Sequence, residues 1–385
     1  MRMVHTGDWH IGKTLRGRNR SEEYQRVLDE LKVFLRKEAI DLLLIAGDLF
    51  DSFTPSAEAE KIVYNFVHDV SLLKIPMVII AGNHDSGLRF EALASLMSFA
   101  GVTMVGYFQE EQPRNLVITA RDGVKVQIVP IPFIPDRTFL RSSTVSQTSE
   151  TNTRIYSQEV GKILQHLAQS FDRDVINIVV SHLLMHGARA GGGERQLYLG
   201  ENYAVHPSEI PDNISYVALG HIHLCQEIKA ASPVYYCGSP LQVDFSETNA
   251  AKGFLLVEAE PHQKCHIKFV ELYSGKQLVE LQGSVQEIKQ ILQENPNLGN
   301  AYLKIVLKNE APGSGALYEF KKIVPNALDI RREFTSAAPK SFPAGTDWLP
   351  KMYEDFYRKH HEQQLPGAIM QEFLSLYEKH SHSQK

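Results

Sequence analysis

The amino-acid sequence predicts an α/β layered fold for residues 1–271, and three observations indicate it. Short runs of apolar, often β-branched residues recur along this stretch, as expected for buried strands. Residues 21–38 and 56–73 show helical periodicity between the first three runs. Later runs follow one another with less helix, so we expect a mixed sheet or a two-sheet sandwich rather than a purely parallel sheet.

Nine runs are predicted as strands of this main domain. In chain order they are MRMVHT, DLLLIAG, PMVIIAG, VKVQIVPI, VINIVVSH, YVALGH, PVYYCG, GFLLVEAE and HIKFVEL. Residues 272–334 predict a separate small α+β unit, because a strand at 278–282 precedes the capping-box pattern Ser284 to Glu287 and the alternating strand AYLKIVL. A second short helix and a strand near ALDIRREF complete this unit.

The rest of the chain predicts a linker and a C-terminal helix pair. Residues 335–346 read TSAAPKSFPAGT, a composition typical of a linker. Residues 347–380 contain two helical segments with apolar side chains at i, i+4 and i+8. These side chains are Trp348, Met352 and Phe356, then Leu365, Ile369 and Phe373. Such faces need a groove or a partner, so the pair is expected either to fold back on the main domain or to dock on another subunit.

The composition is that of an ordinary globular protein. With 43% hydrophobic and 22% charged residues among 385, the chain is not expected to be disordered, collagen-like or membrane-spanning. Three scattered cysteines and an N-terminus without an apolar signal segment predict a cytoplasmic protein. A net charge of −5 argues against a protein that coats nucleic acid, but not against metal-assisted cleavage of it.

Five of the apolar runs end in a short polar motif, in the order GDWH, GD, GNHD, SH and GHIH. Catalytic groups in α/β proteins gather at the carboxyl ends of strands, so motifs far apart in the sequence are expected to converge. In extended backbone, residues i and i+2 point the same way, which lets the paired residues of GDWH and GHIH face one spot. The candidate site residues are Asp8, His10, Asp48, Asn83, His84, Asp85, His182, His221 and His223.

Carboxylate, amide and imidazole donors without thiolate suit manganese, iron or zinc in a catalytic role. Two such metals, about 4 Å apart, can clamp a phosphate and activate a water. Seven side chains suffice for two four-ligand sites if one carboxylate is shared. Asp48 is the natural bridge, since Asn83 has no charged carboxylate. The motifs alone therefore predict a two-metal phosphoesterase.

The ordered motif set resembles the calcineurin-like metallophosphoesterase superfamily, across residues 1 to about 245. HTGDWHIGK, AGDLFD and YYCGSPLQVDFSE further resemble SbcD-type nuclease subunits of the bacterial complex that processes DNA double-strand breaks. This resemblance implies a two-sheet sandwich flanked by helices. It also implies that the small α+β unit is a capping domain and that the C-terminal helix pair docks on a partner.

Carried over to this sequence, the resemblance implies that Asp8, His10, Asp48 and His223 hold one metal. The second metal would be held by Asp48, Asn83, His182 and His221. His84 would bind no metal but would stabilise the scissile phosphate or protonate the leaving oxygen, and Asp85 would set its orientation or pKa. Asp51 stands where archaeal relatives have a histidine, so its role stays open.

The activity implied is a Mn²⁺-dependent nuclease, with two divalent ions, that cuts duplex ends as an exonuclease and single strands or hairpins as an endonuclease. An SbcC-type ATPase is the implied partner, in a heterotetramer built on a homodimer. The dimer would pair through helices 56–73 and 88–100, with Leu93, Leu96, Met97 and Phe99 supplying apolar surface. The alternatives are a small-molecule phosphodiesterase of the same fold and a non-catalytic scaffold that binds DNA ends.

Six basic residues are candidate DNA contacts. Four lie in a run directly after the first motif, where they either stand at the mouth of the site or belong to a solvated loop. Two belong to the Gly-rich stretch around 187–193, which is either a flap on the substrate or a surface loop. The six are Lys13, Arg16, Arg18, Arg20, Arg189 and Arg195.

Overall fold

The computed structural model has two compact units, Met1–Glu333 and Phe334–Lys385, and each is considered by itself. The residues that it describes are 1–109, 115–120, 123–135, 138–139, 149–194, 204–308, 316–333, 348–361 and 365–381.

A six-stranded sheet forms one layer of the first unit. Its order is β14 (His266–Glu271), β13 (Gly253–Glu258), β1 (Arg2–Thr6), β2 (Leu42–Ile45), β3 (Met77–Ile80) and β4 (Val102–Val105). Strands β1 to β4 are parallel, whereas β13 runs antiparallel to β1 and β14 antiparallel to β13. The carboxyl ends of β1, β2 and β3 therefore lie at one edge.

A second six-stranded sheet forms the next layer, which confirms the two-sheet sandwich. Its order is β11 (Gln226–Ile228), β12 (Val234–Tyr236), β10 (Tyr216–Gly220), β7 (Ile176–His182), β6 (Lys125–Ile131) and β5 (Leu116–Thr119). Strands β6, β7, β10 and β12 are parallel, and an antiparallel strand lies at each edge.

Alternation along the strands places side chains in different layers. Met3, Leu42 and Leu44 belong to the core between the two sheets, whereas Val4 and Leu43 face the helices. In the central strands β2, β3, β7 and β10 both faces are buried, which explains why these strands read as continuous apolar runs.

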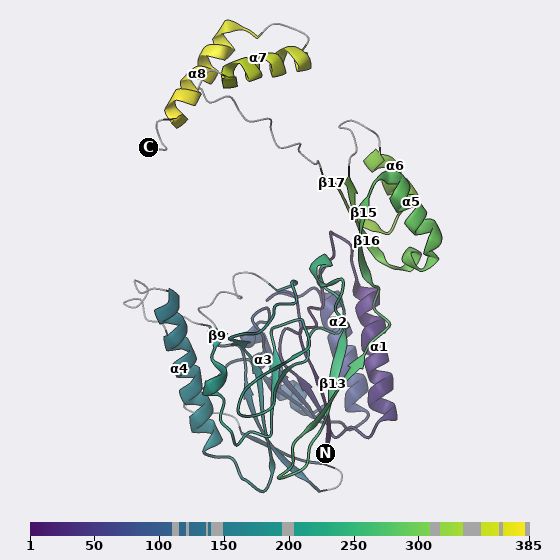
Figure 1. The fold of residues 1–385 in the computed structure, drawn as a ribbon. Helices are drawn as coiled ribbons and strands as arrows, with labels where there is room; N and C mark the ends of the chain where they lie inside the picture. The colour runs from purple at the N-terminus through teal and green to yellow at the C-terminus, as the bar shows by residue number, and fades with distance from the viewer. Residues whose placement is uncertain are drawn as a thin grey trace. The chain divides into compact units, whose positions relative to one another are not determined.

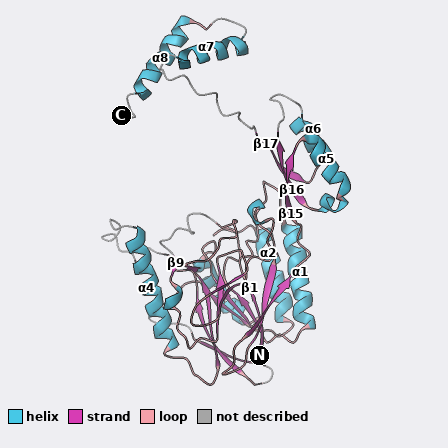
Figure 2. Ribbon diagram, viewed as in Figure 1, coloured by secondary structure: helices cyan, strands magenta, loops and turns pink. Residues whose placement is uncertain are grey.

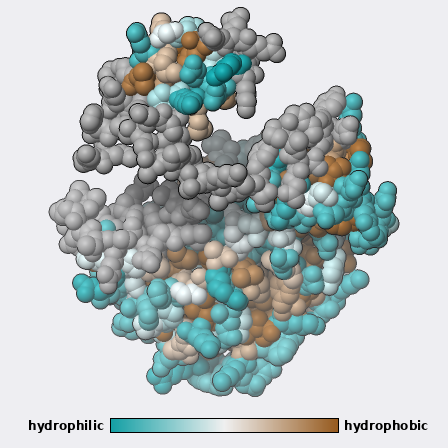
Figure 3. Space-filling model, turned by 45° about the horizontal axis from the view of Figure 1, so that its top comes forward, coloured by the Kyte–Doolittle hydropathy of each residue, from teal (hydrophilic) through white to brown (hydrophobic). Residues whose placement is uncertain are grey.

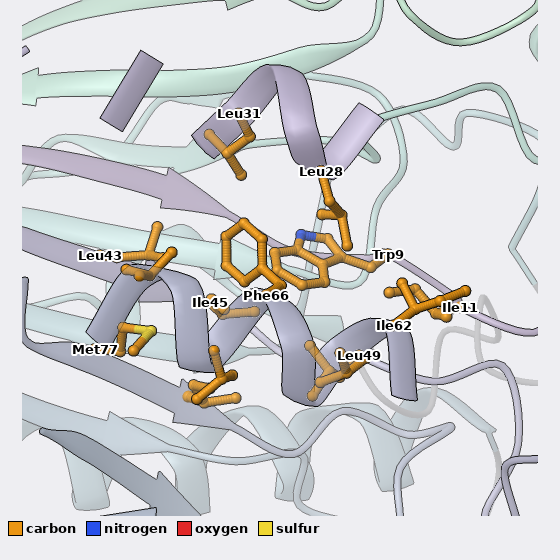
Figure 4. Packing of buried hydrophobic residues seen from close by; sticks show 14 of the residues in the cluster. Trp9, Ile11, Leu28, Leu31, Leu43, Ile45, Leu49, Ile62, Phe66 and Met77 are labelled. Atoms are coloured by element: carbon orange, nitrogen blue, oxygen red, sulfur yellow. The ribbon is translucent and has the colours of Figure 1, made fainter. Parts of the chain in front are cut away.

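Helices α1 (Ser21–Lys37), α2 (Ala57–Ser71) and α3 (Gly87–Ser98) pack on the first sheet, and α4 (Ser149–Ala168) packs on the second. Figure 1 shows α1 and α2 on one side of the sandwich and α4 on the other. In the first helix layer Trp9 lies beside Phe66 and Leu28 (Figure 4), with the Trp9 and Phe66 rings 5.0 Å apart, edge to face.

Helix α4 corrects the expectation of little helix among the later strands. It fills 20 residues between β6 and β7. Its apolar residues Tyr156, Val160, Ile163 and Leu167 have helical spacing and are buried, but its first turn, SETNT, is polar and hides that pattern.

The small α+β unit has the elements expected of it. Strands β15 (Leu278–Gly283), β16 (Tyr302–Lys308) and β17 (Ala327–Glu333) are parallel and lie beside α5 (Val285–Glu294) and α6 (Ala316–Ile323), as Figure 2 shows. The capping box is present, since Ser284 N–H donates to Glu287 Oε2 at 2.7 Å and Glu287 N–H donates to Ser284 Oγ at 3.3 Å. A boundary at residue 271 stays a prediction.

The second unit contains α7 (Trp348–His361) and α8 (Gly367–Ser381). Tyr353 and Phe373 stack between these helices with ring centroids 4.4 Å apart. Met352 and Phe356 are 55% exposed, so part of the apolar surface has no cover within the described part of this unit. The predicted linker 335–346 lies outside the described residues.

The visible face of the molecule mixes broad hydrophilic areas with hydrophobic patches (Figure 3). Among the described helices none has the length and apolar character to cross a membrane.

Candidate metal centre

The predicted site residues lie where five strands end. Those after β1, β2 and β3 come from the first sheet, and those at the ends of β7 and β10 come from the second. All are buried, with exposures from 0 to 4%. They are Asp8, His10, Asp48, Asn83, His84, Asp85, His182, His221 and His223.

Four of these residues have left-handed backbone, which corrects the expectation that extended segments aim them. The φ angles are 50° for Asp8, 49° for His10, 49° for Asp48 and 103° for His221. Such conformations cost about 1–3 kcal/mol each and persist only where neighbouring structure holds them. Here Asp8 N–H donates to Gly47 O and His10 N–H donates to Asp48 O, both at 3.0 Å. Strain concentrated on these residues is typical of a functional site.

One cluster joins Asp8, His10, Asp48 and His223. The Nε2 atoms of His10 and His223 lie 2.9 Å apart, and His10 Nε2 lies 3.6 Å from Asp48 Oδ2. Donor atoms of Asp8, His10 and His223 all lie within 4.8 Å of one another. Asp8 Oδ1 accepts a hydrogen bond from His221 N–H at 2.8 Å, whereas the buried Asp8 Oδ2 has no hydrogen-bond partner among the described residues.

The second cluster joins Asp48, Asn83, His182 and His221. His182 Nδ1 lies 2.8 Å from the carbonyl oxygen of Ala46, so in the neutral ring Nδ1 carries the hydrogen and Nε2 has a lone pair. That Nε2 lies 2.9 Å from Asn83 Oδ1 and 3.5 Å from Asp48 Oδ2. Three acceptor atoms therefore face one another, an arrangement that needs a proton or a cation among them.

The pKa values of the buried acids and of His182 also indicate that this site attracts positive charge. Burial raises the pKa of Asp8 to about 7. Burial alone would lower the pKa of His182, but the Asp48 carboxylate outweighs it and raises that pKa to about 9. The same attraction holds the pKa of Asp48 well below its ordinary value, although burial opposes it. The pocket thus attracts positive charge, and its oxygen and nitrogen donors fit divalent cations.

The role expected of Asp85, to set the orientation or pKa of His84, stays a prediction. The Asp85 carboxylate accepts backbone N–H bonds from Leu49 at 3.0 Å, Phe50 at 2.9 Å and Gly82 at 3.0 Å. Asp85 therefore joins the loops after β2 and β3 through its carboxylate. Asp51 also lies at the His84 ring, with its backbone oxygen 2.9 Å from His84 Nδ1. No sequence spacing distinguished these two aspartates.

The family model for calcineurin-like phosphoesterases matches residues 1–225. The chain belongs to this family. It is 32% identical over 377 residues to the SbcD subunit of nuclease SbcCD from Bacillus subtilis (strain 168), and the match covers 97% of this chain and 95% of the relative. It is 30% identical over 335 residues to the protein of the same name from Staphylococcus epidermidis, covering 86% of this chain and 85% of the relative. The resemblance to SbcD-type subunits is thereby confirmed. As a metallophosphoesterase the chain is a hydrolase.

The structure separates the basic residues predicted to meet DNA. Arg20 is a correction, because it is only 2% exposed and its guanidinium donates to both carboxylate oxygens of Glu23 and to the Gln242 carbonyl. Arg16 pairs with Asp329 of the α+β unit at 3.2 Å. Lys13, Arg18 and Arg189 are more accessible than Arg20.

Lys13 is partly buried at the edge of the site, with Nζ 3.9 Å from Asp51 Oδ1. Arg18 and Arg189 are exposed. Arg195 lies outside the described residues. Positive charge near the metallophosphoesterase centre thus comes from fewer side chains than the basic run suggested.

Three residues around His223 were not predicted from the sequence. Glu247 Oε1 lies 2.8 Å from His223 Nδ1, and Lys252 pairs with Glu247 at 2.8 Å. Glu194 accepts the His223 N–H at 2.8 Å. A signal for Glu247 was available, since it ends the segment YYCGSPLQVDFSE, but only the fold shows that it contacts His223.

Proposed function

We propose that the chain is a metal-dependent DNA nuclease that processes DNA ends and hairpins, as a duplex exonuclease and single-strand endonuclease. Similarity to the SbcD subunit of nuclease SbcCD over 97% of the chain supports this proposal. The name of that relative also supports an SbcC-type ATPase as partner. The three free cysteines of the chain suit a protein that works in the reducing cytoplasm.

The observation that carries the proposal is the group of facing acceptors on His182, Asn83 and Asp48, next to the buried Oδ2 of Asp8, which accepts no hydrogen bond from the described residues. We assign one cation to Asp8, His10, Asp48 and His223, and a second to Asp48, Asn83, His182 and His221. Mn²⁺ is the proposed ion, because the donors are oxygen and imidazole nitrogen without thiolate. When bound, the two ions would polarise the phosphate and lower the pKa of an attacking water.

His84 is proposed to act on the scissile phosphate without holding metal, although its donor atoms also lie within 4.8 Å of those of His10 and Asp48. Its Nδ1 lies 2.9 Å from the Asp51 carbonyl, which keeps the hydrogen there. The proton for the leaving oxygen would then pass through Nε2. The backbone N–H of His84 donates to Asp48 Oδ1 at 2.8 Å, which ties its position to the shared carboxylate.

The DNA is proposed to pass Lys13, Arg18 and Arg189. Arg18 and Arg189 are exposed, and Lys13 lies at the edge of the site with a long contact to Asp51. The proposed path of the DNA is inferred only from the positive charge of these three side chains, which suits contacts to phosphates.

A homodimer within a heterotetramer is also proposed, with one revision of its surface. Met97 is buried and Leu93 packs on the core, so neither is available. In residues 88–100 the exposed large apolar residues are Leu88, Leu96 and Phe99, the last 91% exposed.

Incubation of the purified protein with Mn²⁺ tests the proposal, using labelled duplex, hairpin and single-stranded DNA beside a small phosphodiester such as bis-p-nitrophenyl phosphate. We expect cleavage of DNA that a chelator abolishes. Hydrolysis of the small phosphodiester with all three DNAs intact would indicate a small-molecule phosphodiesterase. Metal and DNA binding without hydrolysis of any substrate would indicate a scaffold for DNA ends.

A further inference from the structure

A buried carboxylate contacts Nδ1 of the proposed ligand His223, whereas the other ring nitrogen, Nε2, faces His10. Glu247 is 1% exposed and lies in the short 3-10 helix η5 (Phe245–Glu247). Its Oε1 lies 2.8 Å from His223 Nδ1, and its Oε2 accepts from Val243 N–H at 3.0 Å. Both carboxylate oxygens are thus occupied by groups of the chain itself.

Lys252 holds this carboxylate and the backbone of the same histidine. Its Nζ lies 2.8 Å from Glu247 Oε2, and it donates to the His223 carbonyl at 2.9 Å and to Ser239 Oγ at 2.8 Å. Lys252 is 6% exposed, so water screens these contacts little. One ammonium group therefore fixes Glu247 relative to His223 at two points.

The contact determines which nitrogen of His223 carries hydrogen. An ionised carboxylate only accepts hydrogen bonds, so Nδ1 must be the donor and Nε2 keeps the lone pair. Nε2 is the atom that lies 2.9 Å from His10 Nε2, among the donors of the first cluster. The hydrogen bond thus turns the lone pair toward the proposed cation.

Residues 191–193 of the Gly-rich segment lie against this hydrogen bond. The segment therefore has contacts within the chain itself, beyond the substrate contact expected of a flap. A side-chain carbon on Gly193 would overlap Glu247 Oε1, and one on Gly191 would press on His223. Glu194 fastens the segment, because it accepts N–H bonds from Gly191 and Gly192 at 2.7 Å and from His223 at 2.8 Å. The absence of side chains at Gly191 and Gly193 lets the backbone approach His223 and Glu247 closely.

We propose that Glu247, held by Lys252 and covered by residues 191–193, is a positioning residue that sets the tautomer and orientation of His223 and so the affinity of one of the two metal positions. Glu247 itself would contact neither metal nor DNA. This inference rests on the proposed metal-dependent function.

Glu247→Gln tests the proposal in the full-length, chelator-treated protein. We expect calorimetric titration with Mn²⁺ to show affinity reduced about 10- to 100-fold at one position, the scale of lost outer-shell support, and unchanged at the other. In parallel, ¹⁵N NMR of labelled imidazoles should show the His223 proton on Nδ1 in the unchanged protein and redistributed in the variant. The His223 signal is assigned by its loss in His223→Gln.

Asp244→Asn is the matched control, since Asp244 lies three residues earlier and its Oδ1 accepts from Ser246 instead of contacting His223. It should leave Mn²⁺ affinity and tautomer unchanged. Because Glu247→Gln leaves the Lys252 charge without its partner, Glu247→Gln with Lys252→Met provides a second variant if the first does not fold. The double variant should show the same loss at one position.

Unchanged affinity at both positions, equal loss at both, or an unchanged His223 tautomer would overturn the assignment. The NMR measurement needs no metal. Failure of the proposed function would instead appear as absence of Mn²⁺ binding by the unchanged protein, and the tautomer would still report on Glu247.

Discussion

His5 couples the stability of the sandwich to pH. It lies on β1 and is fully buried, with its Nδ1 2.8 Å from the hydroxyl of Tyr216 on β10 in the other sheet. Burial lowers the pKa of His5 to about 3, although a backbone contact with Leu219 opposes the shift. The folded protein therefore keeps this ring neutral where an unfolded chain would charge it.

The sign and size of the effect follow from linkage. In the unfolded chain histidine has a pKa near 6.5, so below that pH the unfolded state binds a proton that the folded state does not. Stability from His5 is therefore present above about pH 6.5 and is lost as the pH falls toward 3. Each pH unit in that window costs about 1.4 kcal/mol, which makes about 2.7 kcal/mol at pH 4.5.

His5→Gln removes the titration while an amide can still bond to Tyr216. Urea unfolding of chelator-treated protein, followed by circular dichroism, should show the variant gaining about 2–3 kcal/mol relative to the unchanged protein between pH 8 and pH 4.5. Comparison of the two proteins cancels the other acid-sensitive groups. Tyr216→Phe keeps the ring and should keep the pH dependence. An equal difference at both pH values would refute the reasoning.

Four further predictions concern the proposed function. Asp48→Ala should abolish cleavage and reduce bound metal at both positions, and two ions retained on metal analysis would contradict the bridge. His84→Gln should keep both ions yet lose about 10²-fold or more in rate, so near-normal turnover would remove His84 from the mechanism. Leu96→Glu with Phe99→Glu should convert a dimer to monomer in light scattering, and an unchanged protein that is already monomeric at micromolar concentration would count against dimerisation. Truncation after Ala344 should leave a folded, metal-binding protein that no longer co-purifies with its ATPase, whereas unchanged co-purification would exclude docking by the helix pair.

The positions of the candidate site residues were predictable because each lies at or after the end of a strand whose apolar run is visible in the sequence. Parallel pairing aligns the strand ends within each sheet, and the stacking of the two sheets brings together residues as distant as Asp8 and His221, with His221 N–H 2.8 Å from Asp8 Oδ1. The backbone that aims them was not predictable. The left-handed φ angles at Asp8 and His10 depend on backbone hydrogen bonds to the loop after β2, and no local sequence pattern predicts those hydrogen bonds.

Tertiary contacts also could not be predicted from the sequence. Nothing in the basic run distinguishes Arg20 from Arg18, yet the first is buried and the second exposed. The difference arises because Glu23, one helical turn ahead, and the distant Gln242 carbonyl together satisfy the Arg20 guanidinium. The contact between the Asp51 carbonyl and the His84 ring was likewise not predictable from the sequence, because loop packing decides which groups meet that ring.

The metal centre has two kinds of support. His182 ends a central strand, so the sheet itself holds it. His223 depends on the turn that carries Glu247, and Gln242 connects that turn to the α+β unit. Gln242 Nε2 donates to the Glu247 carbonyl at 2.9 Å, while Gln242 Oε1 accepts the N–H of Leu278, the first residue of β15, at 2.7 Å. Displacement of β15 would therefore break the bond between Leu278 and Gln242, which connects β15 to the turn that carries Glu247.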